Sequence, residues 1–448
     1  MSTAADKFSR LAALRPTRSI PARAAAIRTP GEEDILGRVL GAGIATNHFG
    51  EHLAIRNWFS TPEFSEPSET TLELLSHTRD ESLSRKMRAA LEDPEKWLFL
   101  DTETTGLAGG TGTYAFLIGL GWWDAGGLQV EQFFMRDFAE EHSLLQELSQ
   151  RVAERPVLVT FNGKSFDWPL LENRFTMTRS IAVPKLAAHL DLLHPARALW
   201  KLRLGSVRLV ELERHVLDAP RLGWHRENDV PSAVIPQFYF DYLRGGPGEP
   251  LVGVVRHNQM DLRGLAALFG KINEMLSESS RSTNEIESLD LFGLSRFLQR
   301  RGEDDRAHSA CAKALAIGLP AEIRPKARRE LATMAKHRGE HAEAAEMWLE
   351  IAADPQDGVH ACEQLAIYYE RHTKDMAKAV QFVKLAIATL GRRRADSRDP
   401  FLTARFARLE RKFLHRLARL EKKSPPSSSA QPQRALAVAA PKANPVLW

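Results

Sequence analysis

The sequence predicts an α/β domain, with a mixed sheet and flanking helices, followed by an all-α domain of helical repeats. Three observations support this prediction. Short apolar runs between positions 97 and 134 are separated by turn signals, which is typical of strands joined by hairpins. A helix-period segment then leads into another buried strand and helix, which is typical of a parallel crossover. After Ser277 the chain becomes Ala-rich and contains segments that align with one another.

The expected sheet starts with three strands in an antiparallel meander. Residues 97–100 form a short buried strand that ends in "DTETTG", and residues 114–120 form the next strand. The turn "DAGG" separates it from the third strand, "LQVEQFFMRD". The helical pattern "EEHSLLQELSQRVAE" follows, and "VLVTFNG" then predicts a buried strand that enters a helix carrying Asp167. We expect this strand to lie beside the first, so that the acids after both strands meet at one edge.

Acidic residues stand where the first strand ends. Asp101 and Glu103 are two positions apart, which places both carboxylates on one face of the strand, within reach of a single cation. An Asp-x-Glu triplet is weak evidence by itself, because a chain with 57 acidic residues should contain roughly two by chance. The alternative interpretation is a strand end with two solvated carboxylates. The segments that follow decide between the two interpretations.

A later segment, "VVRHNQMDLRGLAALFGKI", has the apolar spacing of a helix packed on a sheet. His257 and Asp261 are four positions apart and therefore share one face of this helix, one turn apart. That spacing lets the Asp bind a metal ion while the imidazole faces an attacking water. In isolation, such a pair is more often an ordinary surface pair. As the last of three acidic segments in this order, it points to phosphodiester hydrolysis.

The order of these motifs resembles that of a known family. "DTETTGL", "FNGKSFD" and "HNQMD" together resemble the DEDD superfamily of metal-dependent exonucleases. More closely, "DTETTGLAGGTGTYAFLIGLG" with "LDLLHPARALWKLRLGSVRLVELE" resembles the YprB-like ribonuclease H-like family. The resemblance covers about residues 97–272 and implies a ribonuclease H-like sheet. It also implies a site that holds two Mg²⁺ or Mn²⁺ ions, with His257 as general base and four metal-binding carboxylates: Asp101, Glu103, Asp167 and Asp261.

The activity that this resemblance implies is hydrolysis of DNA or RNA by a two-metal-ion mechanism, of the 3′–5′ exonuclease type. Two divalent ions about 4 Å apart repel each other, so several carboxylates are needed to hold them beside a phosphate. Oxygen ligands favour Mg²⁺ or Mn²⁺ over zinc. His257 departs from the best-known branches of the superfamily, because it stands at the four-residue spacing that one branch fills with Tyr. The alternative function is a non-catalytic nucleic-acid-binding scaffold whose helical repeats recruit a protein partner.

Polar and basic residues near these motifs are candidates for nucleic-acid binding. Asn162 and Lys164 lie just before Asp167, although Asn162 has the alternative role of a turn residue in "NG". The segment "ARALWKLRLGSVRLVELE" adds four cations: Arg197, Lys201, Arg203 and Arg208. From this segment we select Lys201 and Arg203 as candidates, because cations that face the site would contact substrate phosphates. A solvated basic face is the alternative.

Other residues of metal-binding type have a simpler explanation. His189, Asp191 and His194 in "HLDLLHP" could form a zinc cluster. The segment also fits an amphipathic passage from strand to helix, where a packing role is more frequent. Cys311 and Cys362 are the two cysteines, both in helical segments. We expect packed free thiols in a reducing cytoplasm, because two cysteines lack the number and spacing of a metal site.

Composition divides the chain into six parts. We expect a disordered basic arm, a small cap with strands, a ribonuclease H-like nuclease domain, tetratricopeptide-like helical repeats, a basic amphipathic helix and a disordered tail. Their expected bounds are 1–30, 31–95, 96–275, 284–391, 392–423 and 424–448. The arm also has the composition of an organelle transit peptide, although a disordered arm is the simpler interpretation. No apolar stretch approaches the ~18 residues of a membrane span, so we expect no membrane-spanning segment.

Three aligned segments predict the helical repeats: "LSRFLQRRGEDDRAHSACAKAL", "LATMAKHRGEHAEAAEMWLEIA" and "LAIYYERHTKDMAKAVQFVKLA". Their matching alanines, Ala307, Ala344 and Ala379, are 37 and 35 positions apart, close to the roughly 34 of a tetratricopeptide unit. Small residues at these positions would let helices cross closely. Stacked helix pairs usually offer a concave protein-binding surface. The alternative is a helical buttress that only stabilises the nuclease domain.

The basic helix expected at 392–423 contains twelve Lys or Arg and four Asp or Glu, while the whole chain has a net charge of only +4. Its apolar residues recur at helical spacing, so one face would pack and the other would be cationic. Such concentrated charge attracts nucleic acid through counterion release. Solvation of an ordinary last helix is the alternative.

Overall fold

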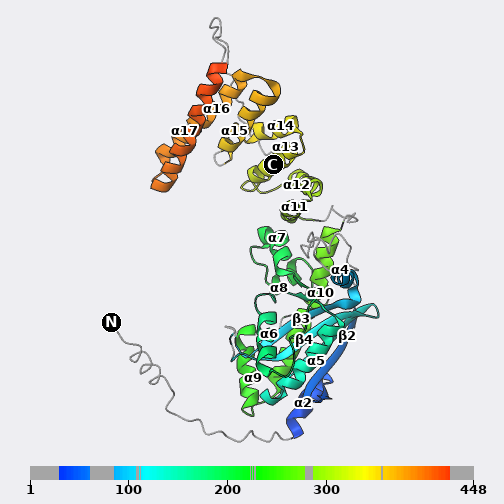
Figure 1. The fold of residues 1–448 in the computed structure, drawn as a ribbon. Helices are drawn as coiled ribbons and strands as arrows, with labels where there is room; N and C mark the ends of the chain where they lie inside the picture. The colour runs from blue at the N-terminus through cyan, green and yellow to red at the C-terminus, as the bar shows by residue number, and fades with distance from the viewer. Residues whose placement is uncertain are drawn as a thin grey trace, which may run out of the picture. The chain divides into compact units, whose positions relative to one another are not determined.

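The computed structural model describes residues 30–60, 85–106, 110, 112–221, 223, 224, 226, 229–277, 286–354 and 357–423. The chain divides into two compact units, Met1–Ile286 and Glu287–Trp448 (Figure 1). Among the residues described, the first unit contains one mixed sheet with helices and the second contains helices. This confirms the predicted fold class. Of the disordered arm and tail predicted at 1–30 and 424–448, residues 1–29 and 424–448 lie outside the described residues, and Pro30 begins a helix. Within the described part of the chain, no helix has the length and apolar character needed to cross a membrane.

Strands of the first unit form a seven-stranded sheet in the order β1-β2-β5-β4-β3-β6-β7. Their bounds are Gly43–Asn47 (β1), Gly50–Ser60 (β2), Trp97–Thr104 (β3), Ala115–Asp124 (β4), Gly127–Phe134 (β5), Val157–Thr160 (β6) and Ala188–Asp191 (β7). β3, β4 and β5 form the predicted antiparallel meander, and β6 lies parallel to β3. The helical crossover between β5 and β6 makes this parallel pairing possible. The carboxyl ends of β3 and β6 therefore meet at one edge.

The strands expected within 31–95 are present, but the prediction that this segment forms a small cap is wrong. β2 pairs with β5, so β1 and β2 extend the main sheet beyond the meander. Leu53 and Ile55 of β2 are buried, and Arg56 forms an ion pair with Glu131 of β5 at 2.6 Å. Alternating apolar residues predict a strand, but they do not identify its partner, because tertiary packing selects the pairing.

Helices flank this sheet (Figure 1). They are α2 (Pro30–Leu40), α4 (Arg85–Glu92), α5 (Glu141–Glu154), α6 (Asp167–Thr178), α7 (Leu193–Leu204), α8 (Leu209–His215), α9 (Ile235–Leu243) and α10 (Glu249–Leu276). α10 packs against β3, β4 and β5, and α5 packs against β1 and β2. Trp97 and Phe99 of β3 contact Phe269 of α10 at ring-centroid distances of 4.9 and 6.4 Å. Because side chains alternate along a strand, Asp101 and Glu103 lie on this same face of β3.

The second unit consists of helices that pack in chain order. They are α11 (Ser288–Arg301), α12 (Asp304–Ile317), α13 (Arg324–His337), α14 (His341–Ile351), α15 (Gly358–Tyr368), α16 (Met376–Asp396) and α17 (Pro400–Lys423). Each of these helices contacts the next. Ala307, Ala344 and Ala379 lie on α12, α14 and α16 and are fully buried, where a larger side chain would separate the helices. The all-helical region is confirmed, and its assignment to the tetratricopeptide family stays a prediction.

The basic helix predicted at 392–423 is wrong at its start. α16 continues to Asp396, and a separate helix, α17, begins at Pro400. Proline has no N–H to donate within a continuing helix. Asp399 accepts a hydrogen bond from the backbone N–H of Phe401 at 2.8 Å, so its side chain caps the new helix. The run of Arg and Lys residues crosses this break, and charge composition alone therefore does not reveal it.

Candidate active site

Acidic side chains from three elements come together at the end of β3. Asp101 and Glu103 lie on β3, Asp167 is the first residue of α6, and Asp261 lies on α10. Because β6 runs parallel to β3 and α6 follows β6, Asp167 arrives at the same edge of the sheet. The hydroxyl of Thr102 donates a hydrogen bond to an Asp167 carboxylate oxygen at 2.5 Å. The structure thus brings the four predicted carboxylates to one place.

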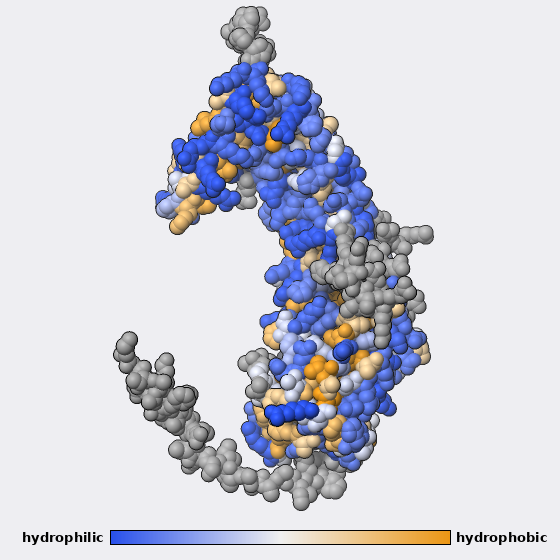
Figure 2. All heavy atoms as spheres, viewed as in Figure 1, coloured by the Kyte–Doolittle hydropathy of each residue, from blue (hydrophilic) through white to orange (hydrophobic). Residues whose placement is uncertain are grey.

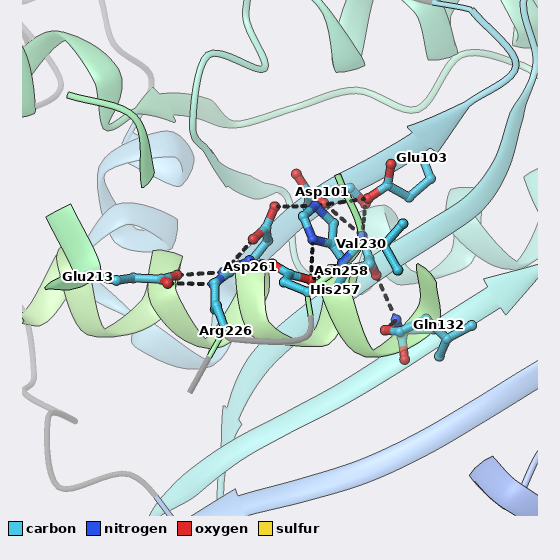
Figure 3. Close-up of polar contacts among 11 residues, drawn as sticks. Asp101, Glu103, Gln132, Glu213, Arg226, Val230, His257, Asn258 and Asp261 are labelled. Atoms are coloured by element: carbon cyan, nitrogen blue, oxygen red, sulfur yellow. Dashed lines mark hydrogen bonds and ion pairs between the residues drawn. The ribbon is translucent and has the colours of Figure 1, made fainter. Parts of the chain in front are cut away.

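A buried amide network holds Asp101 (Figure 3). Asn258 of α10 donates from Nδ2 to the Asp101 carboxylate at 2.7 Å, and its Oδ1 accepts a hydrogen bond from Gln132 at 2.7 Å. Asp101, Gly119 and Gln132 are neighbours across β3, β4 and β5. The Asn258 amide lies over the middle of this row, where a Cβ atom at Gly119 would be 2.0 Å from Asn258 Oδ1. Gly119 therefore leaves the space that Asn258 needs to reach Asp101.

His257 is held by one ring nitrogen and presents the other to the acids. Its Nδ1 lies 2.8 Å from an Asp229 carboxylate oxygen. An ionised carboxylate can only accept a hydrogen bond, so Nδ1 carries the proton in this pair. Nε2 lies 3.8 Å from Glu103 and 3.6 Å from Asp261. Asp229 therefore orients the ring so that Nε2 faces the carboxylates.

Arg226 connects three carboxylates (Figure 3). Its guanidinium donates to Glu213 at 2.6 and 2.7 Å, to Asp229 at 2.8 Å and to Asp261 at 2.5 Å. Glu213 of α8 is buried, and a Cβ atom at Gly264 of α10 would lie 2.1 Å from its Oε1. The missing side chain at Gly264 thus makes room for the Glu213 carboxylate. Through Arg226, this buried carboxylate positions both Asp229 and Asp261.

Burial and mutual repulsion disfavour negative charge among the acids. Burial raises the pKa of Asp101 well above its ordinary value, and the charges of Asp261 and Glu103 raise it further. Burial raises the pKa of Glu103 to about 8, although the positive charge of His257 opposes this change. Burial also raises the pKa of Asp167. A cation bound among these carboxylates would favour their ionised forms.

The imidazole supplies positive charge to the site. Burial lowers the pKa of His257, but the hydrogen bond with Asp229 and the charges of Asp261 and Glu103 outweigh burial and raise this pKa to about 9. Burial raises the pKa of Asp229, but hydrogen bonds from His257 and Arg226 outweigh it and lower this pKa to about 2. Near neutral pH the pair therefore consists of a protonated imidazole and an ionised carboxylate.

The carboxylates have the chemistry of a site for hard divalent cations, because their oxygen atoms suit Mg²⁺ or Mn²⁺. Among the residues described, however, no group of three or more His, Cys, Asp or Glu side chains is arranged to hold a metal ion. Protein groups engage three of the acids instead: Asn258 bonds Asp101, Thr102 bonds Asp167 and Arg226 bonds Asp261. Each of these bonds uses one oxygen of its carboxylate, so binding of a cation here requires the other oxygens to turn toward one another.

The zinc alternative at His189, Asp191 and His194 has no support in the described residues. Asp191 accepts hydrogen bonds from three backbone N–H groups: Asn162 at 2.8 Å, Lys164 at 3.1 Å and Leu193 at 3.0 Å. The bonds from Asn162 and Lys164 hold the loop between β6 and α6, in which Asn162 has a left-handed backbone with φ of 70°. His189 Nε2 lies 2.9 Å from Thr160 Oγ1. Asp191 and His189 thus hold the loop that leads to Asp167.

A cavity of about 740 Å³ opens beside the acids, and His257 and Asp261 line it. Three cationic side chains also line it: Arg197, Lys201 and Arg208. Of the predicted nucleic-acid-binding residues, Asn162 and Lys201 lie in this wall, whereas Lys164 and Arg203 are not among the described residues that line it. The segment that carries the predicted cations therefore faces the site. Lys201 lines the cavity as predicted, and Arg197 and Arg208 line it instead of Arg203.

The sequence motifs do not reveal the residues that position the acids and the imidazole: Asn258, Asp229, Arg226 and Glu213. For two of them the sequence contains a signal. A glycine inside a strand often marks the close approach of another group, and Gly119 stands inside "AFLIGLGWWD". Gly264 inside a long helix is a similar signal, because the Glu213 carboxylate packs where a side chain at position 264 would lie. Arg226 and Asp229 lie outside the helices and strands, in a segment without a periodic pattern.

Comparison with known proteins supports the interpretation of the first unit. Residues 98–273 match the RNase H superfamily. The chain is also similar to the uncharacterized protein YprB of Bacillus subtilis (strain 168), with 30% identity over 349 residues. That similarity covers 76% of the chain and 81% of YprB. Because the first unit ends at Ile286, similarity over this share of the chain includes part of the helical unit.

Proposed function

Because the chain belongs to the YprB-like family of the RNase H superfamily, we propose that it is a metal-dependent nuclease that hydrolyses phosphodiester bonds of DNA or RNA. One observation carries the proposal, the convergence of four carboxylates beside one imidazole at the end of β3: Asp101, Glu103, Asp167 and Asp261 with His257. A DEDD-type, two-metal-ion mechanism of the 3′–5′ exonuclease type is the chemistry that best uses this set.

The same four carboxylates are the proposed metal ligands, and His257 is the proposed general base. Mg²⁺ or Mn²⁺ held by the carboxylates would activate a water molecule, neutralise the phosphate and stabilise the leaving oxygen. The chain orients the other participants. Asp229 turns Nε2 of His257 toward the acids. The charges of Glu103 and Asp261 help to keep the imidazole protonated, and a cation held by these carboxylates would offset them and favour the neutral ring, whose Nε2 can accept a proton from the attacking water. Asn258 keeps the Asp101 carboxylate in a single orientation.

Substrate binding is assigned to the cationic wall of the cavity. Arg197, Lys201 and Arg208 line it together with Asn162, next to the acids. Phosphate groups of a nucleic acid carry the opposite charge and release counterions when Arg or Lys neutralises them. We therefore expect binding to weaken as the salt concentration rises, whereas cleavage at saturating substrate should respond mainly to the metal ion.

The direct test is cleavage of end-labelled single-stranded DNA, duplex DNA and RNA with Mg²⁺, Mn²⁺ or excess chelator. Asp101→Asn removes a charged ligand and retains a polar side chain of the same size. We expect it to lower the cleavage rate by about 10³-fold or more. The matched control is Asp124→Asn, at an exposed carboxylate at the end of β4, which should cleave like the wild type. Cleavage that persists in Asp101→Asn, or in chelator, would contradict the proposal.

Binding of Mn²⁺ gives a second measurement that does not depend on cleavage. Isothermal titration calorimetry of the wild type should show saturable binding. Asp101→Asn should lose about tenfold or more in affinity, because a charged ligand is absent, and Asp124→Asn should bind like the wild type. A wild-type protein that binds no Mn²⁺ would contradict the assignment of the carboxylates as ligands.

A non-catalytic nucleic-acid-binding scaffold is the second candidate. The ion pair of Arg226 with Asp261 favours this candidate, because the guanidinium of Arg226 binds a carboxylate that we propose as a metal ligand. A scaffold would bind oligonucleotides at nanomolar to micromolar strength and release no products during long incubation with Mg²⁺ or Mn²⁺. The cleavage experiment therefore separates the two candidates.

A further inference from the structure

A second cavity lies entirely within the helical unit. Its volume is about 900 Å³, near the upper end of the ~300–1,000 Å³ found for ligand sites. Helices α13, α15, α16 and α17 contribute its walls. Its floor is apolar and consists of Val359, Leu390, Leu402, Phe406, Leu409 and Phe413. In Figure 2 hydrophobic side chains interrupt the hydrophilic surface in the region of the last helices. We call this cavity the helical groove.

The rim of the helical groove has an excess of positive charge. Its two carboxylates are already neutralised, because Asp357 pairs with Arg329 and Glu363 pairs with Lys412 at 2.8 Å. Arg393 and Arg405 also line the groove, and neither has an ion pair with a described residue. One nitrogen of Arg393, Nη2, is buried without a hydrogen-bond partner among the described residues. The groove therefore has cations to offer to an anionic ligand.

The terminal segments of this chain do not match that charge. Residues 424–448 contain one Arg, one Lys and no Asp or Glu. Residues 1–29 contain six Lys or Arg and one Asp. Both segments are cationic and would be repelled by Arg393 and Arg405. A second copy of α17 has the same disadvantage, since this helix has many more Arg and Lys than acidic residues. Charge complementarity therefore favours a different, acidic chain.

The floor favours a peptide over a nucleic acid. Single-stranded nucleic acids bind without sequence preference by stacking their bases on exposed aromatic rings. Of the two phenylalanines in the floor, Phe413 is 2% exposed and Phe406 is partly buried, and both pack against the helical core, so their rings offer little face for stacking. The aromatic ring with the greatest exposure on α17, Phe401 at 87%, is not part of the lining. Leu402 and Leu409 instead provide the irregular apolar surface that receives aliphatic side chains of a helix.

We propose that the helical groove binds an acidic amphipathic helix of a partner protein. Apolar side chains of that helix, at positions i, i+3 or i+4, and i+7, would pack on the floor. Glu or Asp residues flanking this stripe would pair with Arg393 and Arg405. The proposal uses no residue of the first unit. It therefore stands or fails separately from the proposed nuclease function.

The test is fluorescence anisotropy with the full-length protein. The probe is a fluorescein-labelled peptide of about 18 residues, five helical turns, with Leu on one face and Glu elsewhere. A second peptide has the same composition, but its Leu residues are distributed around the helix. A single-stranded oligothymidine of about 20 nucleotides is the third probe. We expect micromolar binding of the amphipathic peptide, and at least tenfold weaker binding of the other two.

Variants locate the binding site. Arg405→Glu reverses an exposed charge of the groove, and Leu402→Ser changes an apolar floor residue that is 41% exposed. Each should weaken peptide binding by about tenfold or more. Arg408→Glu is the matched control, because Arg408 is exposed on the same helix and is not part of the lining. It should bind within about twofold of the wild type. Circular dichroism should show the same helix content in all variants.

Three results would overturn the proposal. Equal loss in Arg405→Glu and Arg408→Glu would show attraction to the general charge of α17. Equal binding of the two peptides would show that no apolar stripe is recognised. Tighter binding of the oligothymidine, with the same sensitivity to Arg405→Glu, would make the groove a nucleic-acid site instead.

Discussion

At the scale of single residues, Gly119 determines how Asp101 is held. The strand register places Gly119 next to Asp101 on one side and next to Gln132 on the other. Asn258 fills the space over the glycine and bonds both neighbours. Its amide is fully buried, so the orientation of one proposed ligand depends on a contact that no side chain at position 119 would permit.

Gly119→Ala tests this contact. We expect the added methyl group to displace the Asn258 amide, which would lower the free energy of unfolding by about 1–3 kcal/mol. Metal-dependent cleavage should fall as well, because Asp101 would lose its hydrogen bond. Urea denaturation and the oligonucleotide assay measure the two effects.

The control is Gly121→Ala on the same face of the same strand, where the nearest atom to a new Cβ is 3.5 Å away. Its stability should change by less than about 1 kcal/mol. If Gly119→Ala had wild-type stability and cleavage, the open space at position 119 would not be what lets Asn258 hold Asp101.

At the scale of elements, Glu131 joins three of them. It lies on β5 with a fully buried side chain, and it accepts hydrogen bonds from Arg56 of β2 at 2.6 Å and from Arg151 of α5 at 2.6 Å. Burial raises the pKa of Glu131, but the hydrogen bonds from both Arg residues outweigh burial and lower its pKa below the usual 4.5. The Glu131 carboxylate thus links β2 and α5 to the antiparallel meander through β5.

The lowered pKa of Glu131 predicts a pH-dependent contribution to stability. This contribution is fully present above the unfolded-state pKa and is lost as the pH falls through the lower folded-state pKa. Glu131→Gln should lower the free energy of unfolding by about 1.5–3 kcal/mol at neutral pH, and its difference from the wild type should shrink below about pH 4.

Urea denaturation between about pH 7 and pH 3 measures this difference. The control is Glu154→Gln, whose carboxylate is 54% exposed and pairs with Arg155 at 3.1 Å. An exposed pair of this kind contributes at most about 1 kcal/mol. If the difference between Glu131→Gln and the wild type were the same at every pH, the ionised carboxylate would not be the source of the stability.

At the scale of the whole molecule, the two units have separate cores. Residues of one large hydrophobic cluster run from Leu36 to Val255, within the first unit. Two further clusters lie between Ala332 and Leu420, within the second. Because each unit buries its own apolar side chains, each should fold without the other.

Separate folding predicts the behaviour of fragments. A protein that ends at Ile286 should retain metal-dependent cleavage, and a protein that begins at Glu287 should retain binding of the acidic peptide. Circular dichroism during heating should give each fragment its own cooperative transition, and the full chain should show both. A fragment that is unfolded by itself would show that the units depend on each other for stability.

The sequence by itself determined the meander, the parallel strand after it, the long helix of His257 and the all-helical region. Periodicity reports these elements because each buries one face, and burial selects apolar residues at the period of a strand or a helix. The candidate acids could be chosen in the same way, since their spacing follows from the period of the element that carries them. The roles of these acids stay proposals.

Only the tertiary structure decided what surrounds these acids. Asn258 reaches Asp101 across a glycine, and Arg226 bonds three carboxylates that are distant in the sequence. Such contacts depend on which surfaces meet, and no periodic pattern encodes them. For the same reason, the joining of β2 to the sheet and the helix break before Pro400 were not predicted. Each depends on a local hydrogen bond or a strand partner, which composition and spacing do not specify.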